Sequence, residues 1–225
     1  MTPILKKQGL DANDLRNFRP ISSLPFVSKI LERVVLLQLQ SHLCANSLLE
    51  IRQSAYRKYH STETAVFSVL EGLLTKSDQK LVSILALLDL SAAFDTHDHA
   101  ILLRRLESTF GISGVVLSWL ELYLRDRMQS IVVDGLMSTP IPLVFGVPQG
   151  SVLGPVLFTL YSQPLSDVIA CHSCDYHTYV DDTEISDSAP PSNFTSAQSN
   201  IQSCISDTLS WMQSNKLKLN TEEKN

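Results

Sequence analysis

Apolar residues recur at helical spacing in several stretches of this chain. The spacing predicts an amphipathic helix from about residue 27 to 43, with Val27 and Ile30 on its apolar stripe. A second helix is expected to begin near Ser61 or Thr62, because a hydroxyl group there can cap the first turn. The same spacing predicts further helices over residues 99–110, 115–125, 152–169 and 197–215.

A continuous apolar run over residues 81–88 has a different pattern. It stops at Asp89, which fits a strand buried on both faces whose last residue emerges at an edge. Residues 177–180 and 183–185 predict a short hairpin, with Asp181 and Asp182 as its turn. A further hairpin is expected around the Asp-Gly turn at residues 134–135.

Composition places the chain among globular proteins. With 225 residues and 44% hydrophobic content, it can bury a core as one domain or as two closely joined subdomains. No stretch approaches the ~18 uncharged apolar residues of a membrane span, and the first residues lack the apolar segment of a secretory signal. We therefore expect an intracellular protein that does not cross a membrane.

The net charge of −5 hides an asymmetry. Residues 1–60 hold nine Lys or Arg against four Asp or Glu, whereas residues 61–225 hold nine against nineteen. A basic N-terminal part suits phosphates, and an acidic remainder suits cations. An ordinary solvated surface can carry the same uneven charge, so charge alone selects no function.

The four cysteines are too few and too irregularly spaced for a disulfide scaffold, so we expect reduced thiols. Cys171 and Cys174 form a CxxC pair with His177 nearby, which could begin a zinc site. No second pair of ligands follows at close spacing, and this favours incidental thiols beside a hairpin.

Three carboxylates follow predicted strands. Asp89 ends one strand, and Asp181 and Asp182 lie at the tip of the predicted hairpin. If both strands belong to one sheet, the three side chains can converge on Mg²⁺, which prefers oxygen ligands. Two such ions could promote an in-line displacement at phosphorus. Taken singly, Asp89 is equally compatible with a strand-end cap, and the Asp pair with a turn.

Ordered motifs along nearly the whole chain, from about Lys6 to Leu219, decide between these interpretations. They read DLRNFRPISSLPFVSKILERVV from Asp14, HSTETA from His60, LLDLSAAFD from Leu87, GVPQGSVLGPVLF from Gly146, YVDDTE from Tyr179 and SWMQSNKLKLN from Ser210. In this order and spacing, the chain resembles the reverse transcriptases of non-LTR (LINE-type) retrotransposons.

The resemblance implies an α+β fold with the fingers and palm of a right-hand polymerase, in which helices pack on an antiparallel palm sheet. Residues 1–80 would form a fingers-like part and residues 81–225 the palm, with a fingers contribution around residues 97–150. We expect the thumb to be absent. The implied partners are an RNA template, a DNA primer and deoxynucleoside triphosphates, with no obligate protein partner and with residence in the nucleus and cytoplasm.

The resemblance also implies roles for individual residues. Asp89, Asp181 and Asp182 would hold two Mg²⁺ ions, with Mn²⁺ as an alternative. Phe94 would pack beneath the incoming sugar and exclude a 2′-hydroxyl. The remaining assignments are nucleotide binding by Gln149, Gly150, Arg57 and Lys58, and template binding by Asn17 and Arg19. For Arg57 and Lys58, a solvated basic loop is the alternative.

The chain departs from the family pattern at a few positions. Ala55 stands where relatives have Gly, and a positive φ there would cost roughly 1 kcal/mol. Glu223 stands where relatives have a lysine that is a candidate proton donor to pyrophosphate. Two functions stay open: an active RNA-directed DNA polymerase core, and a truncated, inactive relic that binds nucleic acid weakly. Another two-metal palm enzyme, such as a cyclase or a DNA-templated polymerase, is a third and weaker interpretation.

Overall fold

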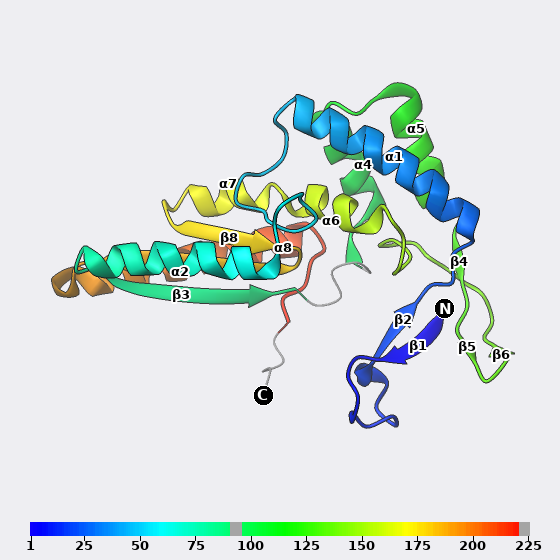
Figure 1. Cartoon of the computed structure of the whole chain (residues 1–225), viewed down its shortest axis with the longest axis horizontal. Helices are drawn as coiled ribbons and strands as arrows, with labels where there is room; N and C mark the ends of the chain where they lie inside the picture. The colour runs from blue at the N-terminus through cyan, green and yellow to red at the C-terminus, as the bar shows by residue number, and fades with distance from the viewer. Residues whose placement is uncertain (91–95, 221–225) are drawn as a thin grey trace. The chain divides into compact units, whose positions relative to one another are not determined.

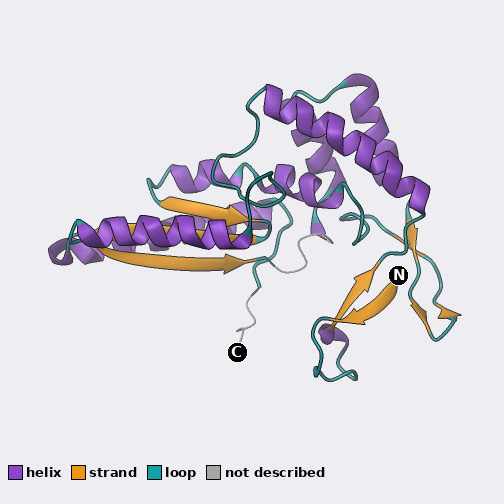
Figure 2. Cartoon of the chain, viewed as in Figure 1, coloured by secondary structure: helices purple, strands orange, loops and turns teal. Residues whose placement is uncertain are grey.

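The computed structural model describes residues 1–90 and 96–220, which divide into two compact units (Figures 1 and 2). The first unit comprises Met1–Ser47 and Phe94–Leu157, and the second comprises Leu48–Ala93 and Phe158–Asn225. The predicted mixture of helices and antiparallel strands is confirmed. The assignment of residues 1–80 to the fingers and residues 81–225 to the palm stays a prediction.

The first unit combines three helices with short two-stranded ribbons. Its elements are β1 (Thr2–Leu5), a 3-10 turn (Leu15–Asn17), β2 (Phe18–Ile21), α1 (Phe26–Ala45), α4 (His99–Ser108), α5 (Gly114–Leu124), β4 (Met128–Gln129), β5 (Val132–Val133), β6 (Leu136–Met137) and β7 (Ile141–Pro142). The strands pair as β1 with β2, β4 with β7, and β5 with β6, all antiparallel. Asp134 and Gly135 both have positive φ, as the predicted hairpin turn requires.

Local sequence explains where α4 begins. The Asp98 carboxylate accepts hydrogen bonds from the backbone N–H groups of Ala100 and Ile101, which satisfies two donors that the helix itself leaves unpaired. Leu102 and Leu106, one turn apart on α4, are fully buried and anchor this helix in the core of the first unit.

The second unit is built on a three-stranded antiparallel sheet with helices on both faces (Figure 1). The strands are β3 (Val82–Asp89), β9 (Asp182–Ala189) and β8 (Asp175–Tyr179), in that spatial order. The helices are α2 (Thr62–Asp78), α7 (Leu165–Ala170) and α8 (Phe194–Ser214), with a 3-10 turn at Pro191–Asn193. Helix α6 (Gly154–Ser162) begins in the first unit and ends in the second.

Alternation along β9 separates the two faces of this sheet. Thr183, Ile185 and Ala189 are buried on the face that α8 covers, together with the α8 residues Ile201 and Cys204. Asp182 and Glu184 point to the opposite face, beneath α2. The buried face therefore carries the core, and on β9 the face beneath α2 is polar.

The predicted start of α2 is confirmed in detail. The Ser61 hydroxyl accepts a hydrogen bond from Thr64 N at 3.2 Å, and Thr64 Oγ1 accepts one from Ser61 N at 2.8 Å. This reciprocal capping box satisfies two backbone donors and fixes the first turn of the helix.

Three predictions about the elements are wrong. The helix expected over residues 152–169 is two helices, because Pro164 lacks an N–H donor and its ring obstructs the preceding turn. The strand ending at Asp89 is not buried on both faces, because Leu87, on the face beneath α2, is 69% exposed. The predicted stripe of α1 is largely exposed, with Val27 at 74% and Ile30 at 50%.

Two broader features agree with the sequence. No described helix has the length and the apolar character that crossing a membrane requires. All four cysteines are free thiols, with Cys174 and Cys204 buried.

Candidate active site

The strand register brings two of the three predicted carboxylates together. Asp89, the last residue of β3, pairs with Asp182 on β9, and Asp182 pairs in turn with Tyr179 on β8. Directly opposed residues of an antiparallel ladder have Cα atoms about 4.5–5.5 Å apart and side chains on one face. Asp89, Asp182 and Tyr179 therefore form a row across the end of the sheet.

The hairpin turn consists of Val180 and Asp181, one position earlier than predicted, and Asp182 already belongs to the ladder. Val180 has a φ of 59°, the sign that the first central residue of a type II′ turn requires. A left-handed conformation costs a residue other than glycine roughly 1–2 kcal/mol. Such strain persists where the surroundings enforce it, and it is common at functional sites.

A hollow of ≈ 480 Å³ opens beside the row of side chains. Asp89, Tyr179 and Asp182 line it, together with Thr62 and Ala65 from the first turn of α2. The two paired carboxylates thus border a space that is large enough to admit a ligand.

Two more titratable residues, His177 and Glu184, face each other across β8 and β9 and line the same hollow. Burial, and after it the negative charge of Asp182, raises the pKa of the Glu184 carboxyl. Burial lowers the pKa of His177, and the nearby side chains of His60 and Arg52 add to this effect. Within the described chain, neither His177 Nε2 nor Glu184 Oε2 has a hydrogen-bond partner.

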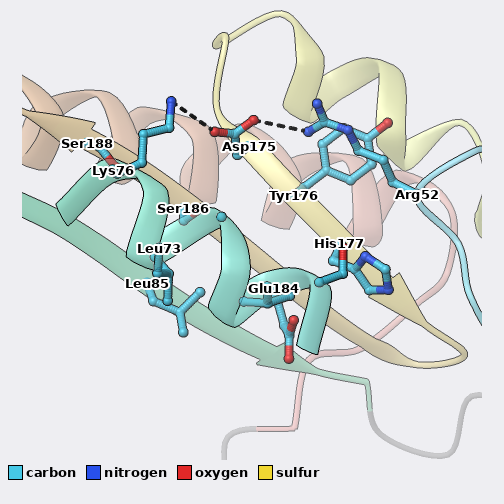
Figure 3. A pocket seen from close by; sticks show the side chains of 13 residues that line it. Arg52, Leu73, Lys76, Leu85, Asp175, Tyr176, His177, Glu184, Ser186 and Ser188 are labelled. Carbon is cyan, nitrogen blue, oxygen red and sulfur yellow. Dashed lines mark hydrogen bonds and ion pairs between the residues drawn. The ribbon is translucent and has the colours of Figure 1, made fainter. Parts of the chain in front are cut away.

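Figure 3 shows a second hollow, of ≈ 280 Å³, on the same sheet face beneath α2. Asp175 pairs there with Arg52 at 3.4 Å and with Lys76 at 3.6 Å. All three side chains are substantially exposed, so each pair contributes about 0–1 kcal/mol. On this face, β8 and β9 carry polar side chains from Asp175 to Asp182, whereas β3 contributes Leu85 and Leu87 before Asp89.

Asn220 holds Asp89 from outside the strand ladder. Its Nδ2 donates to Asp89 Oδ2 at 2.9 Å, and its backbone N donates to Asp89 O at 2.8 Å. The side-chain bond restrains the carboxylate, and the backbone bond ties the segment of Asn220 to the end of β3. Sequence reasoning did not identify Asn220, because the contact joins residues 131 positions apart.

The carboxylate oxygens of this site are suitable ligands for a hard divalent cation. Over residues 1–90 and 96–220, however, no group of three or more His, Cys, Asp or Glu side chains is arranged to hold a metal ion. This applies to the three aspartates and equally to Cys171, Cys174 and His177. The convergence of Asp181 with Asp89 and Asp182 stays a prediction.

The basic residues of the 52–60 loop differ in their roles. Arg57 Nη1 donates to three backbone carbonyls, those of Glu50, Ile51 and Gln53, at 2.8 to 3.2 Å. Arg57 therefore holds the loop together. The Lys58 ammonium lies 4.8 Å from the ring centre of Tyr59 and is otherwise exposed.

The expected strain at Ala55 is instead found at its neighbour. Ala55 is buried and does not have positive φ, whereas Tyr56 has a φ of 58°. Burial raises the pKa of the Tyr56 phenol, and the charge of Asp181 adds to this effect. Tyr56 is thus near the hairpin tip, a role that sequence reasoning missed.

Gln149 and Gly150 belong to the first unit, in the loop that precedes α6. Gln149 O accepts a hydrogen bond from Ser22 N at 2.9 Å, while its side-chain Oε1 is buried and has no partner within the described chain. Gly150 has a φ of +101°, and a Cβ there would lie 3.5 Å from Ser22 O. The backbone conformation therefore requires glycine at this position.

The two predicted template residues lie near the β1–β2 ribbon. Asn17 Nδ2 donates to Asp11 O at 2.9 Å, and Asn17 O accepts from Lys6 N at 2.8 Å, so this residue shapes the ribbon's loop. Arg19 is exposed on β2. Phe94 and Glu223 lie outside the described residues.

Comparison with known proteins gives consistent results. Residues 4–224 match the family described as reverse transcriptase (RNA-dependent DNA polymerase). The chain is 32% identical over 181 residues to the Drosophila melanogaster protein named "Probable RNA-directed DNA polymerase from transposon X-element". This match covers 80% of this chain and 20% of the relative. It is 29% identical over 227 residues to the RNA-directed DNA polymerase from the mobile element jockey, covering 98% of this chain and 24% of that protein. The chain thus spans about a quarter or less of the length of these relatives.

Solved structures with a similar fold include telomerases. Apo telomerase from Candida tropicalis superposes with a TM-score of 0.60 at 16% identity, over 85% of this chain and 36% of that one. Telomerase from Candida albicans, in complex with a fragment of telomeric RNA, gives 0.56 at 16% identity, over 87% and 34%. The similarity of fold, the match along nearly the whole sequence and the paired aspartates agree that the chain belongs to the reverse transcriptase family.

Proposed function

We propose that the site around Asp89 and Asp182 catalyses RNA-directed DNA synthesis. In this reaction a primer 3′-hydroxyl attacks the α-phosphorus of a deoxynucleoside triphosphate, a new P–O bond forms, and pyrophosphate leaves. The observation that carries the proposal is the register of β3 with β9, which sets Asp89 against Asp182 at the edge of a hollow. The names of the two Drosophila relatives support the same activity.

Asp89, Asp181 and Asp182 would hold two Mg²⁺ ions, or Mn²⁺ as an alternative. Two opposed carboxylates beside an adjacent third are a suitable donor set, because Mg²⁺ binds proteins through one or two carboxylates plus substrate phosphates. When bound, such ions would stabilise the attacking and leaving oxygens. Asn220 would keep the Asp89 carboxylate oriented toward its ligand.

The resemblance assigns five residues to binding of the incoming nucleotide. Phe94 would pack against the sugar and exclude a 2′-hydroxyl. Gln149, whose buried Oε1 lacks a partner in the described chain, would accept a hydrogen bond from the nucleotide or template, with Gly150 allowing close backbone approach. Arg57 and Lys58 would neutralise the triphosphate, Arg57 through the guanidinium nitrogens that do not hold the loop.

RNA would serve as the template, contacted at Asn17 and Arg19, and a DNA primer would supply the 3′-hydroxyl. The exposed position of Arg19 suits contact with a phosphate. Asn17, which already holds the ribbon loop, would act mainly by shaping that surface.

Primer extension on an RNA template with Mg²⁺ tests this function. We expect at most weak synthesis by the wild-type chain, and we expect the Asp181→Asn and Asp182→Asn variants to abolish it. Asp175→Asn is a matched control, because it removes the same charge from the exposed start of β8, at the other end of the sheet. Equal activity in wild type and the Asp182→Asn variant would refute the proposed site.

The non-enzymatic alternative is a relic that keeps the fold and binds nucleic acid weakly. It is motivated by Glu223, which stands where the resemblance places a lysine that is a candidate proton donor. RNA binding without any extension, in Mg²⁺ and in Mn²⁺, would support this alternative.

A further inference from the structure

A separate hollow of ≈ 280 Å³ lies in the first unit, beside the loop that carries Gln149. The polar side chains that line it are one guanidinium, three hydroxyl groups and one amide, from Arg127, Ser22, Ser23, Ser130 and Gln129. Met1 lines it as well, and its amino group donates a hydrogen bond to Ser130 O. No carboxylate is among the described residues that line it. The lining is therefore suited to an anion.

Arg127 is held in place by Tyr123. The guanidinium carbon lies 4.5 Å from the centre of the Tyr123 ring, and Arg127 Nε donates to Tyr123 O. Tyr123 is itself buried, stacks on Trp119 with ring centres 5.6 Å apart, and donates from its hydroxyl to Glu32.

This support leaves the outer end of the guanidinium available. Within the part of the chain that the structure describes, no protein acceptor takes a hydrogen bond from the two terminal nitrogens of Arg127. A planar donor whose position is already fixed loses little entropy when it binds a phosphate in bidentate fashion.

The hollow also adjoins the loop before α6. Pro148 lines the hollow, and Ser22, which lines it too, donates from its backbone N to Gln149 O. A group bound here would lie one residue from Gln149.

We propose that this hollow binds a phosphate group, and that the sugar-phosphate backbone of the RNA strand supplies it. Phosphate contacts from arginine and hydroxyl side chains set the register of a nucleic-acid strand without reading its sequence. Arg127 is thus a template-positioning residue that lies outside the carboxylate site. This assignment rests on the proposed function for its ligand, since the same chemistry would also suit the triphosphate of a free nucleotide.

The test measures binding of a short labelled single-stranded RNA to the whole chain by fluorescence polarisation at several salt concentrations. For single strands, the slope of log K against log salt changes by about 0.7 for each phosphate contact. We expect Arg127→Ala to reduce the slope by about this amount and to weaken binding ~10-fold. Arg125→Ala is the matched control, because Arg125 is exposed, pairs with Glu121 and does not line the hollow.

A second variant separates loss of RNA binding from loss of folding. Ser23 is exposed, so Ser23→Asp adds a carboxylate to the hollow without disturbing the core, and we expect it to weaken RNA binding as Arg127→Ala does. Thermal denaturation of each variant checks that the first unit remains folded.

The outcomes distinguish this inference from the proposed polymerase function. The phosphate site alone is overturned if the wild-type chain binds RNA and the Arg127→Ala and Ser23→Asp variants bind it no more weakly than Arg125→Ala does. If Arg127→Ala loses binding of deoxynucleoside triphosphates but keeps RNA binding, the bound phosphate belongs to the nucleotide, and the assignment to the RNA strand is overturned. A wild-type chain that binds no RNA overturns both proposals.

Discussion

Glu32 is a buried carboxylate whose removal should destabilise the first unit. It is 1% exposed on α1, and its Oε2 accepts hydrogen bonds from Val152 N at 2.6 Å, Leu153 N at 3.2 Å and the Tyr123 hydroxyl at 3.3 Å. Burial raises the pKa of the Tyr123 phenol to about 12, so this group is a neutral donor. The two backbone donors lie at the start of α6, where a negative charge is favourable.

The expected magnitude follows from these bonds. A glutamine side chain has the same shape, but its single carbonyl oxygen can accept at most two of the three bonds. Each hydrogen bond to a charged group is worth about 1.5–3 kcal/mol, so Glu32→Gln should reduce the free energy of unfolding by about 1–3 kcal/mol. Glu32→Ala leaves two backbone donors without an acceptor and should cost about 2–6 kcal/mol.

Urea denaturation followed by tryptophan fluorescence can measure this in the first unit alone. The chain has two tryptophans, and a Trp211→Phe background leaves Trp119, which stacks on Tyr123. With a slope of roughly 1–3 kcal/mol per M, Glu32→Gln should lower the urea midpoint by about 1 M. Glu121→Gln, which removes an exposed carboxylate paired with Arg125, should change stability by less than about 1 kcal/mol. Equal midpoints for the two variants would refute the reasoning.

Three further predictions concern the second unit. Burial lowers the pKa of His177 below the ordinary value of 6.5, so the unfolded chain binds the proton more readily than the folded chain. The free energy of unfolding should therefore fall as the pH drops below 6.5, and the fall should be smaller in His177→Asn. Urea titrations at about pH 5.5 and about pH 8 measure this difference. Asn220→Ala removes the bond that orients Asp89, so Mn²⁺ affinity measured by calorimetry should fall about 10- to 100-fold, and unchanged affinity would contradict this role. Arg57→Lys cannot reproduce three bonds to carbonyls, so limited proteolysis should cleave the 52–60 loop faster than in wild type, whereas Lys58→Arg should match wild type.

Much of the fold could be predicted from local patterns. The start of α2 depends on a hydroxyl and a backbone N–H only three residues apart, so sequence alone identifies it. The apolar run before Asp89 identified β3. The burial of this strand depends on which elements cover the sheet, so the exposure of Leu87 could not be predicted from the run itself. Pro164 was visible, yet the apolar spacing continued past it and masked the break between α6 and α7.

The sequence predicted the carboxylates of the candidate site but not the residue that orients Asp89. Asp89 and Asp182 stood out because acids followed strand patterns. Asn220 gave no local signal, because it acts on a partner 131 positions away. The exact turn position also escaped prediction, since Asp182 joins the ladder only through its pairing with Asp89 and Tyr179.

The ladder between β3 and β9 has a consequence for how this protein can vary. Side chains alternate between faces along a strand, so a shift of one position moves every later residue to the other side of the sheet. Deleting or inserting one residue between Val82 and Leu88 would therefore turn Asp89 away from Asp182 while leaving its identity intact. Substitutions within β3 that keep its length leave this register unchanged, whereas a change in its length does not.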